Sequence, residues 1–173
     1  MIEYQVMDGG QARSELEALT DVLQGCVSEG ASVGFIDPED RQIMRNFWQD
    51  TFVGLDRGDR LLLVARDGGR LVATVMIFWN NMPNGRHRAE IGKLLVHPRA
   101  RRQGIARQLM QLAEQRVKEA GRSLMVLDTR SGDVASLLYL SLGWEIAGAI
   151  PFYAQSTEGA MDATTVMYKR LTV

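Results

Sequence analysis

The chain has 173 residues, of which 46% are hydrophobic and 24% are charged, a balance typical of one domain that buries its own core. Its 20 basic residues nearly cancel its 21 acidic residues, which excludes binding of nucleic acid or an anionic membrane by bulk charge. A single cysteine excludes an internal disulfide, and two histidines make no recognisable structural zinc set, so we expect a reducing cytoplasm and no metal.

The first ten residues do not read as a secretory signal, because they carry Glu3 and Asp8 and no basic flank to an apolar run. Apolar runs such as residues 61–65 are too short to span a bilayer. We therefore expect neither a signal peptide nor a membrane-spanning segment.

The first part of the chain predicts one strand and two helices. Weak alternation indicates a strand over residues 2–7, and apolar residues at helical spacing then indicate a helix that ends near Gly30. Asp37 followed by Pro38 is typical of an N-cap and first turn, so the second helix is expected to begin there and to stop near Gly58.

The middle of the chain predicts a hairpin and a further strand. Residues 60–66 and 70–79 have the composition of paired strands, and the turn 67–69 between them contains two glycines. After the loop 80–85, another strand is expected over residues 88–96.

The last part of the chain predicts two helices and three strands. Pro98 ends the preceding strand, and small and apolar residues then keep to one face of a helix that closes at Gly121. The remaining expected elements are a strand over 124–127, a helix over 134–142, and strands over 144–150 and 164–169.

This element order predicts the fold class. We expect one α/β domain of the mixed α+β kind over residues 1–173, with a central mixed, mostly antiparallel twisted sheet of about six to seven strands flanked by four helices. No linker, repeat or low-complexity tract divides the chain.

The loop after residue 96 has the features of a phosphate cradle. Backbone N–H groups of such a loop and of the helix start converge on one point, and Gly104 and Ala106 let a diphosphate approach the backbone closely. Arginines at positions 99, 101, 102 and 107 add full charges suited to phosphate oxygens. On these residues alone, an ordinary solvated helix start remains the alternative.

The same loop resembles the central signature of the GNAT superfamily of N-acetyltransferases. Leu94-Leu95-Val96-His97-Pro98 and Arg101-x-x-Gly104-x-Ala106 are similar to the stretch that binds the coenzyme A pyrophosphate in that superfamily, and Tyr139 with Gly143-Trp144 is similar to its later hallmark. The resemblance implies the GNAT fold, acetyl-CoA as cosubstrate, and coenzyme contacts at Leu94, Leu95, Val96, Arg101, Arg102, Gln103, Gly104, Ile105, Ala106 and Arg107.

A narrower resemblance is to the tabtoxin-resistance acetyltransferases. It is carried by residues 30–35, by Pro83-Asn84-Gly85 with Arg88-Ala89-Glu90, and by Leu127-Asp128-Thr129. It implies an amine of a small molecule as acceptor, such as an amino acid or a tabtoxinine-like toxin, and a role in toxin resistance. The chain departs from the superfamily at Gly132, where many members have an asparagine that bonds the pantetheine arm; Ser131 or Asp133 is left as a replacement.

Acetyl transfer requires a group that takes a proton from the attacking ammonium. The resemblance implies Glu90 as the general base and Asp128 as its companion, and two carboxylates in one cleft would bind a cation and raise one pKa. Strand alternation puts Glu90, Leu94 and Val96 on one side unless a bulge intervenes near Gly92. The alternative is that Glu90 is a solvent-facing strand residue paired with Arg88 or Lys93, and that Asp128 is a strand-end residue that caps the next turn.

The remaining candidate roles rest partly on the resemblance and partly on the residues themselves. Tyr139 is the implied general acid for the coenzyme A thiolate, with a plain packing tyrosine as the alternative, and the backbone N–H of Leu94 is the implied oxyanion donor. The loop carrying Ser32 and Phe35 is expected to wall the acceptor site. Cys26, on an apolar helix face, is expected in the core, and both histidines are expected to be non-catalytic.

The expected function is therefore transfer of an acetyl group from acetyl-CoA to a small amine. The alternative is a non-catalytic acyl-CoA-binding sensor, because binding needs only the cradle. A nucleic-acid module built on the arginines is the weakest reading, since interleaved aromatics and a wider basic patch are missing. We expect no nucleic acid or membrane partner; many relatives form homodimers, but nothing in this sequence identifies an interface.

Overall fold

A seven-stranded sheet forms the centre of the structure, a computed structural model that describes residues 1–172. The strand order is β1-β2-β3-β4-β5-β7-β6, and every neighbouring pair is antiparallel except β4 and β5. The strands are β1 (Ile2–Met7), β2 (Arg60–Asp67), β3 (Arg70–Trp79), β4 (Arg88–Val96), β5 (Leu124–Arg130), β6 (Glu145–Gln155) and β7 (Met161–Arg170). The prediction of a mixed, mostly antiparallel sheet is confirmed.

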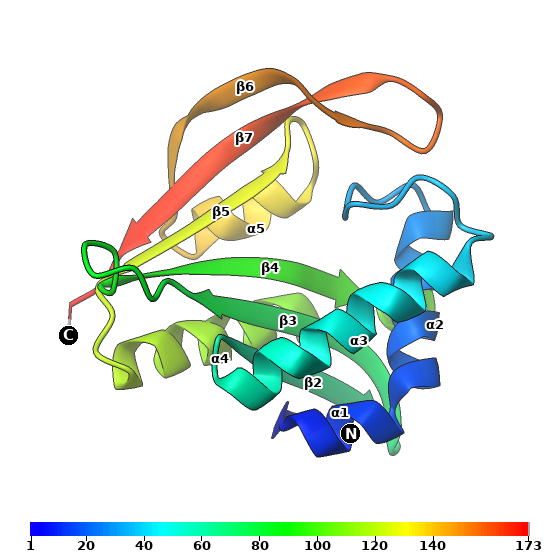
Figure 1. Cartoon of the computed structure of the whole chain (residues 1–173). Coiled ribbons are helices and arrows are strands. Elements are labelled where there is room, and N and C mark those ends of the chain that lie inside the picture. The colour runs from blue at the N-terminus through cyan, green and yellow to red at the C-terminus, as the bar shows by residue number, and fades with distance from the viewer. Residues whose placement is uncertain (173) are drawn as a thin grey trace.

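Helices cover both faces of this sheet (Figure 1). The described residues contain α1 (Gly9–Ser14), α2 (Leu16–Ser28), α3 (Arg41–Arg57), α4 (Ile105–Glu119) and α5 (Ala135–Ser141), with a 3₁₀ turn at Pro98–Ala100. No helix in this part of the chain is long and apolar enough to cross a membrane. Figure 1 shows α3 in front of strands β2 to β4 and α4 behind them.

Two hydrophobic cores follow from this arrangement. Apolar side chains that alternate along β2 and β3 divide between them: Leu62 and Met76 pack with Trp48 of α3, whereas Leu63 and Ile77 pack with Leu109 of α4. Both helices were predicted from apolar residues at helical spacing, and burying that stripe on the sheet is what stabilises them.

The sequence prediction was wrong at the start of α3. Asp40 is the N-cap, and its carboxylate accepts the N–H of Ile43. The carboxylate of Asp37 instead accepts the N–H of Glu39, within a turn that precedes the helix. The Asp-Pro pair therefore builds a turn three residues early, a use that these residue types serve equally well.

Two further features were not predicted. The chain turns into the short helix α1 directly after β1, where Asp8 and Gln11 form a reciprocal capping box, so the described residues hold five α-helices instead of four. The strands β5 and β6 also run past their predicted ends, to Arg130 and Gln155. Pro151 lies within β6, which is tolerated because β6 is the edge strand, where a missing N–H need not break a ladder.

The pairing between β4 and β5 decides where the site lies. These strands are parallel neighbours only from Arg88 to Glu90 on β4 and from Leu124 to Val126 on β5. Beyond that point the two strands diverge. The edges of β4 and β5 that face each other there are no longer joined by backbone hydrogen bonds.

Candidate active site

A β-bulge interrupts β4 where the two strands diverge. Thr74 of β3 lies opposite Leu95, and Met76 lies opposite Gly92, so Val75 alone faces the two residues between them. Lys93, the first of these two, has a left-handed backbone with φ of 49°. The hydroxyl of Thr74, itself fully buried, donates a 2.8 Å hydrogen bond to the carbonyl of Lys93 and holds the bulge in place.

The glycine before the bulge allows a close contact. A Cβ atom at Gly92 would lie 2.9 Å from the ring of Phe78, so a larger residue would displace this ring from the floor of the site. Gly92 was the one sequence signal for a bulge, and the register shift occurs directly after it.

The bulge redistributes the side chains of β4. Ile91 and Leu95 are four positions apart, so they would share a face of a regular strand. Instead, Ile91 belongs to the core under α4, and Leu95 belongs to the core under α1 to α3. Leu94 packs against the α4 side, so it does not share a side with Glu90, which pairs with Phe78 of the other core. The sequence predicted a shared side unless a bulge intervened near Gly92, and the structure shows that bulge.

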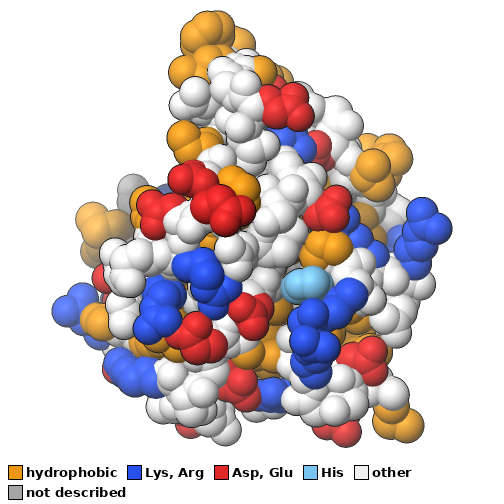
Figure 2. Space-filling view, turned by 90° about the vertical axis from the view of Figure 1, so that its right-hand side faces the viewer, with side chains coloured by type: hydrophobic (Ala, Val, Ile, Leu, Met, Phe, Trp, Pro, Cys, Tyr) orange, Lys and Arg blue, Asp and Glu red, His pale blue; other side chains and the backbone are white. Residues whose placement is uncertain are grey.

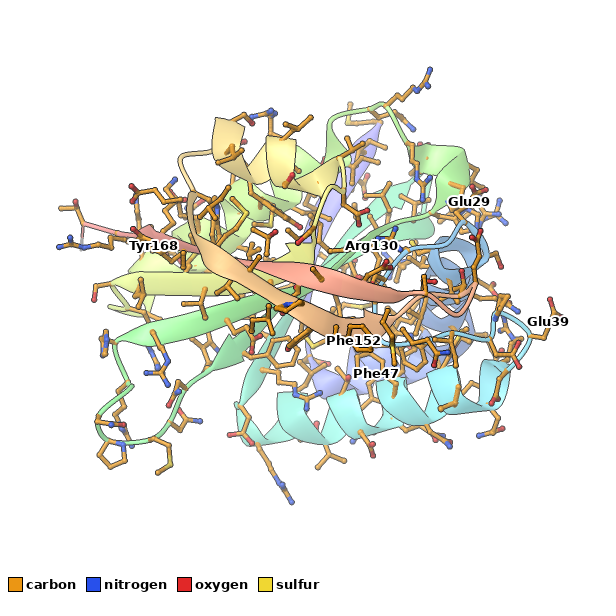
Figure 3. All side chains as sticks on the ribbon, turned by 90° about the horizontal axis from the view of Figure 1, so that it is seen from above. Glu29, Glu39, Phe47, Arg130, Phe152 and Tyr168 are labelled. Atoms are coloured by element: carbon orange, nitrogen blue, oxygen red, sulfur yellow. The ribbon has the colours of Figure 1, made fainter. Side chains whose placement is uncertain are left out.

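A cavity of about 440 Å³ opens between the diverging strands. Its walls are β4, β5, the loop between α2 and α3, and the β6–β7 hairpin, which passes over it in the view from above (Figure 3). It brings together the predicted residues Ser32, Glu90, Leu94, Asp128 and Tyr139. Phe35 does not line it; this residue borders an adjoining hollow of about 330 Å³, which Ser32 also lines, and packs edge-on against Phe47.

The two predicted carboxylates interact across this cavity. Partial burial and the negative charge of Asp128 raise the pKa of Glu90, while the positive charge of Lys93 opposes the rise. Asp128 accepts a 2.8 Å hydrogen bond from the hydroxyl of Thr164 on β7. Within residues 1–172, Glu90 forms no ion pair with Arg88 or Lys93, so its carboxylate is available to a ligand.

Tyr139 of α5 reaches the cavity from the α4 side of the sheet. It is 7% exposed, and its ring packs at a tilt against Trp144 with centroids 6.1 Å apart. Burial, and then the charges of Asp133 and Asp128, raise the pKa of Tyr139 to about 12. Its hydroxyl therefore keeps its proton at neutral pH and can donate a hydrogen bond.

The predicted cradle precedes α4 with an open geometry. Arg102 and Gly104 both have left-handed backbones, with φ of 66° and 73°, and the N-cap position Gly104 offers no side chain to the first helical N–H groups. Nothing lies within 4 Å of a Cβ added at Gly104. The first N–H groups of α4 thus have no side-chain cap, and they are the kind of donor that a diphosphate requires.

Side chains near the cradle divide into exposed and buried sets. Leu95 and Ile105 are 1% and 2% exposed, so only their backbone groups are available to a ligand. Arg101, Arg102 and Arg107 are exposed, and Arg107 donates a hydrogen bond to the hydroxyl of Ser141 on α5.

The turn at Gly132 offers no ready substitute for the missing asparagine. Gly132 has φ of 85°. The hydroxyl of Ser131 is hydrogen-bonded to Thr165, and the carboxylate of Asp133 binds Arg130 at 2.9 Å. Both side chains that the sequence left as replacements are thus already engaged.

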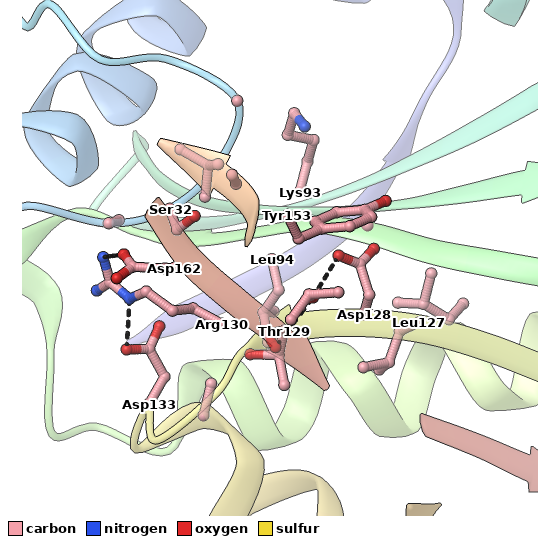
Figure 4. A pocket seen from close by; sticks show the side chains of 18 of the residues that line it. Ser32, Lys93, Leu94, Leu127, Asp128, Thr129, Arg130, Asp133, Tyr153 and Asp162 are labelled. Carbon is pink, nitrogen blue, oxygen red and sulfur yellow. Dashed lines mark hydrogen bonds and ion pairs between the residues drawn. The ribbon is translucent and has the colours of Figure 1, made fainter. Parts of the chain in front are cut away.

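Sequence reasoning gave no site role to several residues that line the cavity, among them Lys93, Arg130 and Tyr153. Arg130 pairs with Asp133 and, at 3.7 Å, with Asp162 (Figure 4). It also donates a 3.0 Å hydrogen bond to the carbonyl of Gly30. Arg130 and Tyr153 lie beyond the predicted ends of their strands. Lys93 was considered only as an ion-pair partner of Glu90; in an unbroken strand its side chain would point to the opposite face.

The residues expected to be non-catalytic lie outside this cavity. Cys26 is 3% exposed in the core, as predicted. His97 caps the turn after β4, its Nδ1 accepting the N–H of Arg99, and with Arg70 it borders a separate small hollow. Figure 2 shows basic side chains gathered beside a histidine on this face.

Comparison with known proteins identifies the family of this chain. Residues 18–144 match the acetyltransferase (GNAT) family. An uncharacterised N-acetyltransferase in the hisH–hisA intergenic region of Azospirillum brasilense is 28% identical over 118 residues, which are 67% of this chain and 68% of the relative.

Solved structures share the fold over nearly the whole chain. The chain matches yncA of Salmonella typhimurium, assigned as an acetyltransferase and solved with its cofactor acetyl-CoA, with a TM-score of 0.79 and 19% identity, covering 100% of this chain and 95% of that one. It matches an N-acetyltransferase of Staphylococcus aureus Mu50 with a TM-score of 0.82 and 17% identity, covering 99% of each. Because the family match spans well over half of the sequence, the protein belongs to the GNAT family of acetyltransferases.

Proposed function

We propose that this protein transfers the acetyl group of acetyl-CoA to the primary amine of a small molecule. The observation that carries the proposal is the cavity between β4 and β5, which Glu90, Asp128 and Tyr139 all line. A pure coenzyme-binding sensor would need the cradle but would not need these three groups in one cavity.

The residues of the cradle fit coenzyme A. Its pyrophosphate would bind the N–H groups from Arg102 to Arg107, because the left-handed turns and the uncapped helix start leave these donors free. The exposed guanidinium groups of Arg101 and Arg102 would add charge-assisted bonds to phosphate oxygens. The bound coenzyme supplies the thioester whose acetyl group is transferred.

Glu90 acts as the general base in this proposal. An ammonium group cannot attack a thioester, and Glu90 accepts its proton directly or through one water molecule. The raised pKa makes Glu90 a better base than an ordinary glutamate, and Asp128 contributes to that rise. The two carboxylates also attract a cationic amine into the cavity.

Leu94 and Tyr139 stabilise the two negative charges that develop during transfer, on the thioester oxygen and on the departing sulfur. The N–H of Leu94, at the bulge, donates to the oxygen that becomes negative. The hydroxyl of Tyr139 donates a hydrogen bond to the departing thiolate. A tyrosine with a pKa of about 12 does not fully protonate the thiolate of a thiol whose pKa is about 8.5, so Tyr139 stabilises the leaving group and solvent completes its protonation.

The acceptor and the setting of the reaction are proposed on narrower grounds. Resemblance to tabtoxin-resistance enzymes favours an amino acid or tabtoxinine-like acceptor and a role in toxin resistance. A Brucella melitensis protein of similar fold, with a TM-score of 0.79 and 20% identity over 98% of this chain and 99% of that one, is named a ribosomal-protein-alanine N-acetyltransferase, so a protein N-terminus is the competing acceptor. The free, buried Cys26 suits a reducing cytoplasm.

The experiment is a screen for thiol release from acetyl-CoA. Purified protein is incubated with amino acids, polyamines, aminoglycosides, toxin-like lactams and an alanine-initiated peptide. Release that depends on one class of amine supports the proposal. Tight binding of acetyl-CoA by calorimetry, with no amine-dependent release from any class, would instead support the sensor.

A further inference from the structure

Lys93 occupies a position that an ordinary strand could not give it. The bulge turns its side chain toward α3, where the ammonium group lies 5.1 Å from the centre of the Phe47 ring. The loop between α2 and α3 lies beside it, with the ammonium 3.9 Å from the Cβ position of Gly34. Figure 4 shows the side chain extending toward this loop from the wall of the cavity.

Holding Lys93 there has a conformational cost. A left-handed backbone at a residue other than glycine costs about 1 kcal/mol, and here the buried hydroxyl of Thr74 stabilises it through the carbonyl of Lys93. Strain of this kind that is held by a buried hydrogen bond is typical of functional positions.

The charge of Lys93 has no carboxylate partner within 4 Å in residues 1–172, unlike the other lysines of the chain. Lys118 and Lys169 both pair with Glu114, at 3.6 Å and 2.6 Å. Arg130, the other cation of the cavity, pairs with Asp133 and Asp162. Burial lowers the pKa of Lys93, while Asp128 and Glu90 oppose this, so a bound anion would further stabilise its charged form.

The cavity therefore presents two unlike regions to a ligand. Glu90 and Asp128 suit an ammonium group, and Lys93, on the same side of β4, suits an anion. A molecule carrying both groups complements both regions. A polyamine would complement the carboxylates but would be repelled by Lys93.

We propose that Lys93 binds the carboxylate of the acceptor, and that the acceptor is a zwitterionic amino acid whose amine lies at Glu90 and Asp128. This inference rests on the proposed function and deepens it: Lys93 determines specificity and takes no part in proton transfer. The competing role for Lys93 is to tune the carboxylates alone, in which case it would affect all amines equally.

The test compares free amino acids with their carboxamides as acceptors. The ratio of kcat/KM for an acid to that for its amide is measured in the full chain, at a pH on the plateau of the wild-type profile. We expect wild type to favour the acids and Lys93→Met to reduce this ratio by about ten- to a hundredfold, the range for losing a charged hydrogen-bond donor. The amine of an amino acid and that of its amide differ in basicity. This difference cancels when the acid-to-amide ratio of kcat/KM is compared between wild type and variant.

Two variants complete the design. Lys93→Arg keeps the charge and should retain most of the preference, and Lys118→Met removes a charge from the surface of α4 and should leave the ratio unchanged. An equal loss for acids and amides in Lys93→Met, or a wild type that does not favour acids, would overturn the proposal.

A binding experiment separates this inference from the proposed function. Free amino acids and their amides are titrated calorimetrically into the protein saturated with coenzyme A. Selective binding of the acids that is lost in Lys93→Met supports the subsite even if no amine releases thiol. Equal binding of acids and amides by wild type excludes it.

Discussion

Glu90 and Lys93 lie three residues apart on β4, yet both project into the same cavity, because the strand bulges between them. In an unbroken strand, residues three positions apart point to opposite faces. The bulge thus brings these two side chains to one cavity, and the hydroxyl of Thr74 donates a hydrogen bond to the carbonyl of Lys93 within it.

Thr74→Val should destabilise the protein and weaken the site together. It leaves the carbonyl of Lys93 without its buried donor, which should lower the free energy of unfolding by about 1–3 kcal/mol in chemical denaturation. The control is Thr20→Val, equally buried, whose hydroxyl only supplements a helical bond to the carbonyl of Leu16. Activity per folded molecule should fall in the first variant and not in the second; unchanged activity in both would show that the bulge does not depend on Thr74.

Glu90→Gln should lower turnover at neutral pH by about a hundredfold, because it keeps the shape of the side chain but removes the proton acceptor. Raising the pH should restore much of the activity, since solution then supplies more neutral amine. Glu39→Gln, on the exposed turn before α3, is the control for a lost carboxylate. Turnover at the wild-type level in Glu90→Gln would remove this residue from the mechanism and leave Asp128 as the leading base.

Asp128→Asn should shift the acid limb of the pH–rate profile toward lower pH. The negative charge of Asp128 raises the pKa of Glu90, so its removal lowers that pKa and the base stays ionised in more acidic solution. Lys93→Met should shift the limb the other way, because Lys93 lowers the same pKa. The measurement is kcat/KM against pH for a good acceptor, and shifts in the same direction for both variants would contradict the assignment.

Tyr139→Phe should reduce turnover by less than about a hundredfold, the low end for loss of an acid, because a thiolate leaves without much help. Affinity for coenzyme A should stay nearly constant, since the ring and its contact with Trp144 remain. Tyr168→Phe, which removes a tyrosine hydroxyl from β7, is the matched control and should leave turnover unchanged. If Tyr139 only packs, its variant will melt at a lower temperature while turnover per folded molecule stays the same.

Gly104→Ala should weaken coenzyme A binding by about tenfold or more. The added methyl group stands where the pyrophosphate approaches the backbone, and φ of 73° is strained for alanine. Gly121→Ala is a close control at the other end of α4: its φ is 76°, and nothing lies within 4 Å of its Cβ position. Calorimetry should show loss of affinity only in the first variant, and equal affinities would exclude the cradle.

Local sequence was sufficient for several elements and for part of the site. Apolar residues at helical spacing located α2 and α4, and the paired glycines after Asp67 located the hairpin of β2 and β3. The cradle could also be predicted, because Gly104 and the start of α4 are neighbours in the chain. Local sequence failed at Asp37, since an Asp-Pro pair suits a turn and a helix start equally well.

The sequence by itself determined which chemical groups are present: the carboxylates of Glu90 and Asp128, the hydroxyl of Tyr139 and the glycine turn of the cradle. Only the tertiary structure decided which of them meet. The bulge at Lys93 depends on Thr74 and Val75 of β3, and the cavity depends on β4 and β5 ceasing to pair after Glu90. These are interactions between segments far apart in the chain, and such pairing energies are invisible to the periodicity of any single segment.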